Sequence, residues 1–506
     1  MKDPLQHSRA MHLPNEILLM IGKHVDDLPT KRSLTLCSKQ FCHLFQPLLY
    51  SQLDLTAIYH RRDKTILRKV AIPLIQHICR RPDLASFVRC LKVEADDPTR
   101  LDYSLHPDTE RVDENANNPT SPASQGEENA EQVDEDVKLD IALLNSVLEE
   151  ICEKDSERSK WLSQLVALNE EAWSSILFTR LVHVKELSLW YGMPLLFQEI
   201  LNRISKRNKP FHETSPFPFL RKVEIWRLPS SYADSNLAVP FFSLPTVRII
   251  RILDLSGQDW LDTDDIRFDL SSIANPTHSV TEIFFGGAVS SRVIGKWLAA
   301  CDKLESFNMQ YGYHVQEYTY DAVVENPFHP NELRQSLLRF SKSLEHLVMG
   351  FSLRYPIVRE TFVENEDDPH DWEDMPFDSL KDFSVLKILA MRHQNLMMLV
   401  EDDKDEYLGN LLPSSLEYLV FLEIDKTRFS QLVSNLIQLI REREIHVPQL
   451  ETIGLDIDLA PHSNDPTDYE NNENFLLLET ACADNGIGLQ LEGYSEDQKN
   501  SNEVSF

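Results

Sequence analysis

The most regular feature of this sequence is a short apolar pattern that recurs along most of its length. Each copy has three apolar residues spaced as in LxxLxL, and the last two alternate as residues of a half-buried strand do. From the second copy onward, the copies begin roughly 24 to 42 residues apart, a spacing typical of repeat proteins. The copies are Val88, Leu91, Val93; Val184, Leu187, Leu189; Leu220, Val223, Ile225; Ile250, Leu253, Leu255; Val280, Ile283, Phe285; Leu304, Phe307, Met309; Leu344, Leu347, Met349; Leu386, Leu389, Met391; Leu416, Leu419, Phe421; and Leu450, Ile453, Leu455.

The intervals between these copies carry apolar residues at helical spacing. Two examples run from Asp140 to Glu150 and from Phe429 to Ile440. A strand, a helix and a return to a parallel neighbour require a right-handed crossover, and stacked units bury the apolar edge that each exposes alone. We therefore predict a β/α solenoid over residues 137–493, with its last strand at 487–491.

Apolar residues at helical spacing also fill the segment from Leu13 to Tyr50. In the first expected helix Pro14 suits the N1 position, because the N–H that proline lacks would be unpaired there. The pattern breaks after Asp26, where either Pro29 restarts a helix or Thr30 caps it. The next apolar residues predict one continuous helix that Pro47 interrupts, and they are Leu34, Cys37, Phe41 and Leu44.

These two or three short helices are too small to bury their apolar residues among themselves, because a segment of about 40 residues has little interior. Gly22 weakens the first helix further, since glycine costs about 1 kcal/mol against alanine in a helix interior. Two interpretations stay open. The helices dock on an external partner, or they form a plain cap on the domain that follows.

Many positions of this segment resemble the F-box family, whose pattern has an LPxEIL opening and a second LxxCSKxF helix. Ser38 and Lys39 belong to that match, and the PLLY ending at Tyr50 resembles fungal members. In that family the helices dock on a Skp-type adaptor, which links to a cullin scaffold and its ubiquitin-charged enzyme. The resemblance implies that the adaptor-binding residues are Leu13, Pro14, Glu16, Ile17, Leu18, Ile21, Val25, Leu34, Cys37 and Phe41, the last three in a supporting position.

The LxxLxL copies are similar to the leucine-rich repeats often found behind an F-box. Regular repeats place Asn or Cys three residues beyond the last apolar position, where the side chain satisfies backbone groups of the turn. Here those places hold other residues, such as Gly192, Gln258 and Asp458, so irregular turns are expected. The resemblance implies an α+β fold, in which a short N-terminal helical F-box is followed by a degenerate leucine-rich-repeat-like β/α solenoid.

Composition divides the chain further. Residues 96–136 are rich in Asp, Glu, Asn, Ser and Pro and nearly free of large apolar residues, which predicts a disordered insertion. It is either a plain solvated segment or one phosphorylated at Ser121 or Ser124. The predicted segments are a flexible N-terminus at 1–10, the F-box at 11–55, linker helices and a first repeat at 56–95, the acidic insertion at 96–136, the solenoid at 137–493 and a flexible C-terminus at 494–506.

Charge and cysteine content narrow the class of protein. The net charge of −31 repels a phosphate backbone, which argues against a nucleic-acid partner. No signal peptide or membrane-spanning run is evident, so we expect a cytosolic or nuclear protein without a membrane partner. The seven cysteines form no CxxC pair and are interpreted as reduced, mostly buried packing residues.

Aromatic residues near the ends of the apolar copies are candidates for substrate binding. Aromatic side chains with a polar group are favoured anchors in interfaces, although the same residues can also pack in a core. Two acidic runs, at 363–378 and 400–407, are expected as loops that either attract a basic ligand or are simply solvated. The candidate substrate-binding residues are Trp190, Tyr191, Trp226, Trp260, Tyr311 and Tyr313.

The sequence contains no motif for catalysis or metal binding. It lacks a Gly-rich phosphate loop, HExxH, GxSxG and an EF-hand, and the aspartates at 259–265 lack the glycine and glutamate of a calcium loop. We therefore predict no cofactor, no metal and no catalytic residue.

The expected function is that of a non-catalytic subunit of an SCF-type ubiquitin ligase, with an F-box for the Skp-type adaptor and a solenoid for an unknown protein substrate. One alternative is an interaction scaffold whose F-box acts outside ubiquitination. Another is a hydrolase in the central region, for which no nucleophile and base can be named.

Overall fold

The computed structural model of the protein describes residues 13–25, 27–56, 64–95, 138–191, 195–213, 216–227, 238–256, 279–288, 291–311, 329–351, 375–402, 407–457 and 466–491. The predicted acidic insertion and the two predicted flexible termini lie outside these residues. Trp260, Tyr313, most of the acidic run at 363–378 and the middle of the run at 400–407 also lie outside them.

Within the described residues, twelve parallel strands form one open sheet and follow one another in chain order from β1 to β12. Helices lie between most of the strands in the sequence, so the predicted α+β class is confirmed. The chain divides into two compact units. The first comprises Met1–Val184, Trp190–Arg203 and Arg207–Ser215, and the second comprises Lys185–Leu189, Ile204–Lys206 and Pro216–Phe506.

The first unit begins with three short helices, α1 (Asn15–Lys23), α2 (Leu28–Cys37) and α3 (Lys39–Leu49). Pro14 is the N-cap residue of α1 rather than its first helical residue. The side chain of Asp27 caps α2 by accepting a hydrogen bond of 2.8 Å from the Thr30 N–H. Pro29 lies in the first turn of α2, which agrees with the interpretation that a helix restarts at this proline. The interpretation that Thr30 caps the helix is wrong, because the N-cap residue is Asp27.

The predicted continuous second helix is wrong, because Ser38 divides it. Ser38 has an extended backbone, and its hydroxyl accepts a hydrogen bond of 3.1 Å from the Phe41 N–H, so it ends α2 and caps α3. The spacing of apolar residues continues through this break, which is why periodicity alone did not detect it. The predicted interruption at Pro47 is also wrong, since Pro47 lies inside α3.

The rest of the first unit contains two strands and several helices. β1 pairs with β2 in parallel, with Leu53 opposite Leu91, so the end of the predicted F-box segment at 11–55 belongs to the sheet. A strand of three residues carries too little alternation to be seen in the sequence. The elements are β1 (Gln52–Asp54), α5 (Lys64–Arg80), α6 (Pro82–Ala85), β2 (Cys90–Ala95), α7 (Ile141–Ile151), α8 (Asp155–Val166), α9 (Glu170–Arg180) and most of α10 (Leu195–Lys206).

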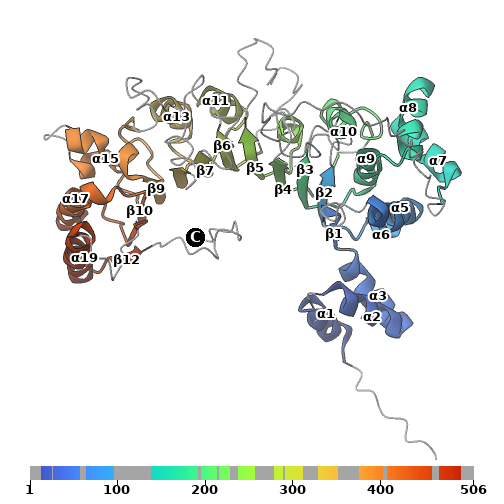
Figure 1. Cartoon of the computed structure of the whole chain (residues 1–506), viewed down its shortest axis with the longest axis horizontal. Coiled ribbons are helices and arrows are strands. Elements are labelled where there is room, and N and C mark those ends of the chain that lie inside the picture. The colour runs from blue at the N-terminus through green and yellow to red at the C-terminus, as the bar shows by residue number, and fades with distance from the viewer. Residues whose placement is uncertain are drawn as a thin grey trace, which may run out of the picture. The chain divides into compact units, whose positions relative to one another are not determined.

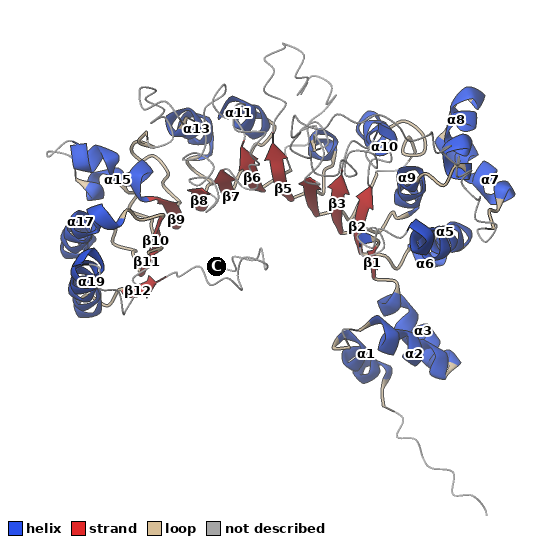
Figure 2. Cartoon of the chain, viewed as in Figure 1, coloured by secondary structure: helices blue, strands red, loops and turns tan. Residues whose placement is uncertain are grey.

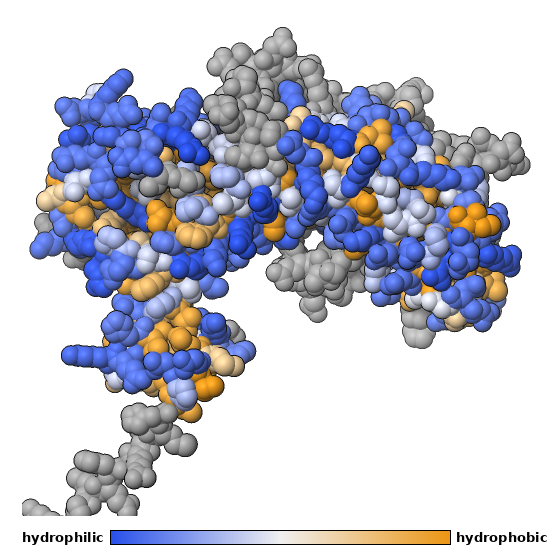
Figure 3. Space-filling model, turned by 180° about the vertical axis from the view of Figure 1, so that it is seen from behind, coloured by the Kyte–Doolittle hydropathy of each residue, from blue (hydrophilic) through white to orange (hydrophobic). Residues whose placement is uncertain are grey.

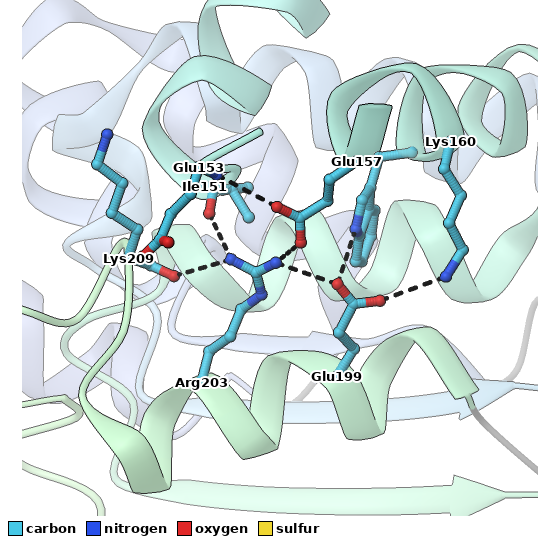
Figure 4. A network of polar contacts seen from close by, with 8 residues as sticks. Ile151, Glu153, Glu157, Lys160, Glu199, Arg203 and Lys209 are labelled. Carbon is cyan, nitrogen blue, oxygen red and sulfur yellow. Dashed lines mark hydrogen bonds and ion pairs between the residues drawn. The ribbon is translucent and has the colours of Figure 1, made fainter. Parts of the chain in front are cut away.

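One guanidinium group links three of these helices (Figure 4). Arg203 of α10 pairs with Glu157 of α8 and, at 3.1 Å, with Glu199 of its own helix. The same group donates to the carbonyl oxygens of Ile151, at 2.7 Å, and Lys209, at 3.3 Å. Burial lowers the pKa of Arg203, whose side chain is 11% exposed, but the surrounding oxygens satisfy its charge.

The second unit contains the longer part of the sheet. Figures 1 and 2 show its helices α11, α13, α15, α17 and α19 on one face of the strands. Its elements, including the two residues of β3 that fall in the first unit, are β3 (Glu186–Tyr191), β4 (Lys222–Arg227), η3 (Val239–Ser243), β5 (Ile249–Ser256), β6 (Glu282–Ala288), α11 (Ser291–Ala299), β7 (Ser306–Tyr311), α13 (Pro330–Leu337), η6 (Leu338–Phe340), β8 (His346–Phe351), β9 (Ile388–Arg392), α15 (His393–Asp402), α16 (Leu408–Leu411), β10 (Tyr418–Leu422), η8 (Lys426–Arg428), α17 (Phe429–Arg441), α18 (Arg443–His446), β11 (Thr452–Leu455), α19 (Pro466–Asp484) and β12 (Gly488–Leu491).

The recurring apolar pattern forms the core of this sheet. Equivalent positions of neighbouring copies stand opposite one another, so that Phe307 of β7 pairs with Leu347 of β8, which pairs with Leu389 of β9. Alternating residues share one face of a strand, and these paired apolar positions, such as Phe307, Leu347 and Leu389, are buried. The predicted strands at these copies are therefore confirmed.

One copy was assigned in the wrong register. In β5, Ile250 pairs with Val223 of β4, so the three core positions are Val247, Ile250 and Ile252 rather than Ile250, Leu253 and Leu255. The strand holds apolar residues on both faces, and two overlapping LxxLxL matches result. A break in register between Ile252 and Leu255 adds to the ambiguity.

The last predicted strand is confirmed as β12, which pairs with β11 at the end of the strand order. Ile487 is buried, whereas Leu491 is 46% exposed. A strand at the end of an open sheet has one neighbour, so its side chains are less completely covered.

Candidate partner-binding surfaces

The three N-terminal helices expose an unusual amount of apolar surface for their size. Figure 3 shows apolar residues gathered on these helices. In the described part of this segment, residues 13–25 and 27–50, only Gly22 and Phe45 are buried. The exposed apolar side chains are Leu13 (43%), Ile17 (40%), Met20 (58%), Ile21 (49%), Leu28 (56%) and Leu36 (75%).

Phe45 of α3 lies at the centre of the contact between α3 and α1. The ring of Phe45 meets that of Phe41 edge to face, with centroids 5.3 Å apart. Gly22 of α1 lies directly against the Phe45 ring, so a Cβ at this position would come within 2.7 Å of Phe45 Cδ1 and 2.9 Å of Leu48 Cδ1. The small interior between these helices is therefore filled by this one contact. The other apolar side chains of the segment lie outside that interior.

The residues assigned to adaptor binding divide by exposure. The half-buried ones are Leu18, Val25, Leu34 and Phe41, while the exposed ones are Leu13, Pro14, Glu16, Ile17, Ile21 and Cys37. Met20, Leu28 and Leu36 were not among the candidates, although they are more exposed than Ile17. Met20 could have been found, since it lies three residues from Ile17 on the same helix.

Three of the candidate aromatic residues, Trp190, Trp226 and Tyr311, have side chains in the described part of the chain. Trp190 and Trp226 are half-buried in β3 and β4. Tyr311 is completely buried, so the expectation that it anchors a ligand at the surface is wrong. In β7 it alternates with Phe307 and Met309 and therefore belongs to the core face. The side chain of Tyr191 lies outside the described residues.

The face of the sheet opposite the helices carries an apolar cluster that the sequence did not reveal. Ala390, Val420 and Leu422 are buried there, and Val348 packs against them. Two of these side chains of β10 lie over glycines of other strands. Leu422 Cδ1 is 3.1 Å from a Cβ position at Gly350 of β8, and Val420 Cγ2 is 3.1 Å from one at Gly454 of β11. These residues are scattered in the sequence and form no local pattern there. Only the pairing of their strands brings them together.

An ion pair lies at the carboxyl end of these strands. Arg392 Nε lies 2.8 Å from Glu423 Oε2, with the two side chains 13% and 20% exposed. Glu423 has a left-handed backbone, with φ of 50°, and its N–H donates to the Asp456 carboxylate at 3.3 Å. A non-glycine residue in this conformation is held there by its surroundings.

The cysteines have the properties of packing residues more than of nucleophiles. Cys152, Cys301 and Cys482 are buried, Cys42, Cys79 and Cys90 are half-buried, and Cys37 is exposed. Burial raises the pKa of Cys301 to about 12 and those of Cys79 and Cys482 to about 11. A thiol with so high a pKa is a poor source of thiolate near neutral pH.

No protein-family model matches the chain, and no curated protein matches it. Among the described helices, none is long and apolar enough to cross a membrane. The described residues contain no cluster of three His, Cys, Asp or Glu side chains that could hold a metal ion.

Proposed function

We propose that this protein is the substrate-recognition adaptor of an SCF-type ubiquitin ligase. Helices α1, α2 and α3 would bind the Skp-type adaptor, and through it a cullin. The strand and helix units that follow these helices would stack as a degenerate leucine-rich-repeat-like solenoid that binds a protein substrate. Ubiquitin transfer itself would take place on other subunits.

The observation that carries the proposal is the exposed apolar surface of α1 and α2. Removing apolar surface from water contributes roughly 25 cal/mol per Å², so a cluster of exposed side chains such as Ile17, Met20 and Ile21 favours association. Three of the exposed residues, Leu13, Ile17 and Ile21, are also positions at which the sequence resembles the F-box.

The solenoid part of the proposal is supported by the regular pairing in the second unit. Each described strand from β4 to β12 pairs in parallel with its neighbour in the chain, and the helices of this unit lie on one face. Units of strand and helix that contact only their neighbours are the organisation of solenoid proteins. The helix-free face would then be available to a substrate.

The test is co-purification of the Skp-type adaptor with the full chain. We expect Ile17→Asp combined with Ile21→Asp to abolish recovery, because two carboxylates would be buried in an apolar interface. Both side chains are 40% or more exposed, so the fold should survive. A matched control is Ile445→Asp with Leu477→Asp, which changes side chains 75% and 60% exposed on α18 and α19.

Equal recovery with both pairs of substitutions would overturn the docking role. If the adaptor is lost only from the Ile17 and Ile21 variant, turnover of bound proteins in cells can be compared between this variant and the control. Stabilisation of the same proteins in the variant alone is the result expected of a ligase subunit. Adaptor binding without any such change would instead indicate a scaffold acting outside ubiquitination.

A further inference from the structure

One edge of the sheet brings together residues that are far apart in the sequence. In the second unit, the residue after the first apolar core position of a repeat accepts hydrogen bonds at its carbonyl oxygen from the start of the next strand. Arg221 N and Lys222 N both donate to Lys185 O, at 2.8 and 3.1 Å. Arg248 N and Ile249 N both donate to Arg221 O, at 2.9 and 3.0 Å.

The same contact continues along the second unit and defines what we call the edge row. Because each member bonds directly to the next, the backbone positions of adjacent members lie about one strand spacing apart, roughly 4.8 Å. The edge row is Lys185, Arg221, Arg248, Thr281, Glu305, Glu345, Lys387, Glu417 and Glu451.

Positive and negative charges are unevenly distributed along this row. Its first three members are cations, Lys185, Arg221 and Arg248, which we call the cationic row. After Thr281 the row is mostly acidic, and there the charges are partly neutralised. Lys387 Nζ lies 2.6 Å from Glu345 Oε2, and Lys303 pairs with Glu305.

The cationic row lacks this neutralisation. All three side chains belong to exposed residues, and within the described part of the chain no carboxylate lies at ion-pair distance from any of them. Arg248 Nη1 donates a hydrogen bond to the Ser279 carbonyl oxygen at 2.6 Å. This bond positions the guanidinium group but does not neutralise its charge. The nearby Glu224 is occupied by Lys222, at 2.8 Å, and Arg251, at 3.7 Å.

Such an arrangement opposes stability. Like charges at neighbouring positions of adjacent chain segments are destabilising, and adjacent members of the cationic row occupy such positions twice in succession. The chain has 81 acidic and 50 basic residues, so an unpaired run of three cations is not a consequence of its composition. A negatively charged ligand would remove the repulsion.

We propose that Lys185, Arg221 and Arg248 bind a carboxylate-rich segment of a protein partner. Three cations spaced over about 10 Å suit three separate monoanions, whereas one phosphate group would need cations that converge on a single point. Guanidinium groups also match carboxylates in a two-pronged geometry. The net charge of −31 repels a nucleic acid at long range, while a short acidic peptide carries too little charge to be excluded.

This inference deepens the proposed function, on which it rests for the identity of the partner, since the segment would belong to the substrate. The binding itself can be measured with no ligase component present. The decisive variant is Lys185→Gln, Arg221→Gln and Arg248→Gln together in the full chain. A matched control removes the same charge from exposed side chains elsewhere in the second unit by Lys342→Gln, Lys381→Gln and Arg441→Gln.

The probe is a short fluorescein-labelled peptide of alternating glutamate and glycine, with its glutamine counterpart and a phosphoserine peptide as comparisons. Fluorescence anisotropy should give a Kd for the glutamate peptide that rises with salt. In the cationic-row variant the Kd should rise at least about tenfold, equivalent to about 1.4 kcal/mol, and the control should match the wild type. Thermal unfolding should show the variant at least as stable as the wild type, because the repulsion is gone.

Several outcomes would overturn the inference. They are equal affinity of the variant and wild type, absence of glutamate-peptide binding by the wild type, or binding of the phosphoserine peptide alone. A variant that loses both binding and stability would show that the three side chains are structural. The Ile17 and Ile21 variant should keep peptide binding and the cationic-row variant should keep adaptor binding, so the two proposals fail independently.

Discussion

At the scale of single residues, Gly22 shows two opposing effects of one missing side chain. A glycine in a helix costs about 1 kcal/mol against alanine, which predicts that Gly22→Ala would stabilise α1. The Phe45 and Leu48 side chains occupy the space that the new methyl group would need. Overpacking of this kind costs about 1–3 kcal/mol, so the steric effect should win.

We therefore expect Gly22→Ala to destabilise the packing of α1 on α3. Hydrogen exchange followed by mass spectrometry should show faster exchange over Asn15–Lys23 in the variant. Gly295→Ala in α11 is the control, since its Cβ would meet only Ser336 side-chain atoms, the nearest at 3.0 Å. Slower exchange in α1 of the Gly22 variant would contradict the expectation.

The same scale shows where residue patterns mislead. Tyr311 is aromatic, carries a hydroxyl and follows an apolar copy, which are properties of a binding residue as well as of a core residue. Its alternation with Phe307 and Met309 placed it in the core, and the structure shows it completely buried. Strand alternation was therefore a better guide than side-chain chemistry.

At the scale of elements, caps and ion clusters decide where helices end and which helices pack together. Ser38 separates α2 from α3 although the apolar stripe continues across it. Arg203 joins α10 to α8 and to the carbonyl end of α7 through oxygens whose sequence positions give no hint of proximity. Removing one member of a largely buried charge cluster leaves the others without compensation.

Arg203→Met should lower the free energy of unfolding of the first unit by about 3 kcal/mol, because Glu157 would lose its cation and Glu199 would keep only the partly exposed Lys160, at 3.6 Å. Urea unfolding followed by the fluorescence of the buried Trp161 and Trp173 would measure this. The control is Arg158→Met, whose ion pairs with Glu149 and Asp155 are largely exposed and should contribute less than about 1 kcal/mol. Equal shifts for the two variants would count against the buried-cluster explanation.

At the scale of the whole molecule, the ends of the sheet need protection that the interior repeats give one another. In the second unit α19 packs against α17, and β12 pairs with β11 at the end of the strand order. Leu478 and Cys482 of α19 are buried in that contact region. Helix α19 and β12 therefore cover the α17 surface and the β11 edge in the second unit.

Truncation after Ile457 should make the protein aggregate, because it uncovers the α17 surface and the backbone edge of β11. Size-exclusion chromatography with light scattering would detect this as growth in mass with concentration. The control is the full chain with Leu476→Ser and Leu477→Ser, which changes side chains 58% and 60% exposed and should stay monodisperse like the wild type. A truncated protein as monodisperse as this control would show that α19 and β12 do not protect the array.

The sequence by itself determined the strands other than β1, because each of these is marked by apolar residues at a spacing that only a strand with one buried face requires. The length of the N-terminal helical segment also indicated that its helices cannot bury their apolar residues among themselves. Only the tertiary structure decided the register of β5, where Val247 and Leu255 fit the pattern equally well. Only strand pairing, too, set Lys185, Arg221 and Arg248 side by side, because hydrogen bonds between strands join residues that no local pattern connects.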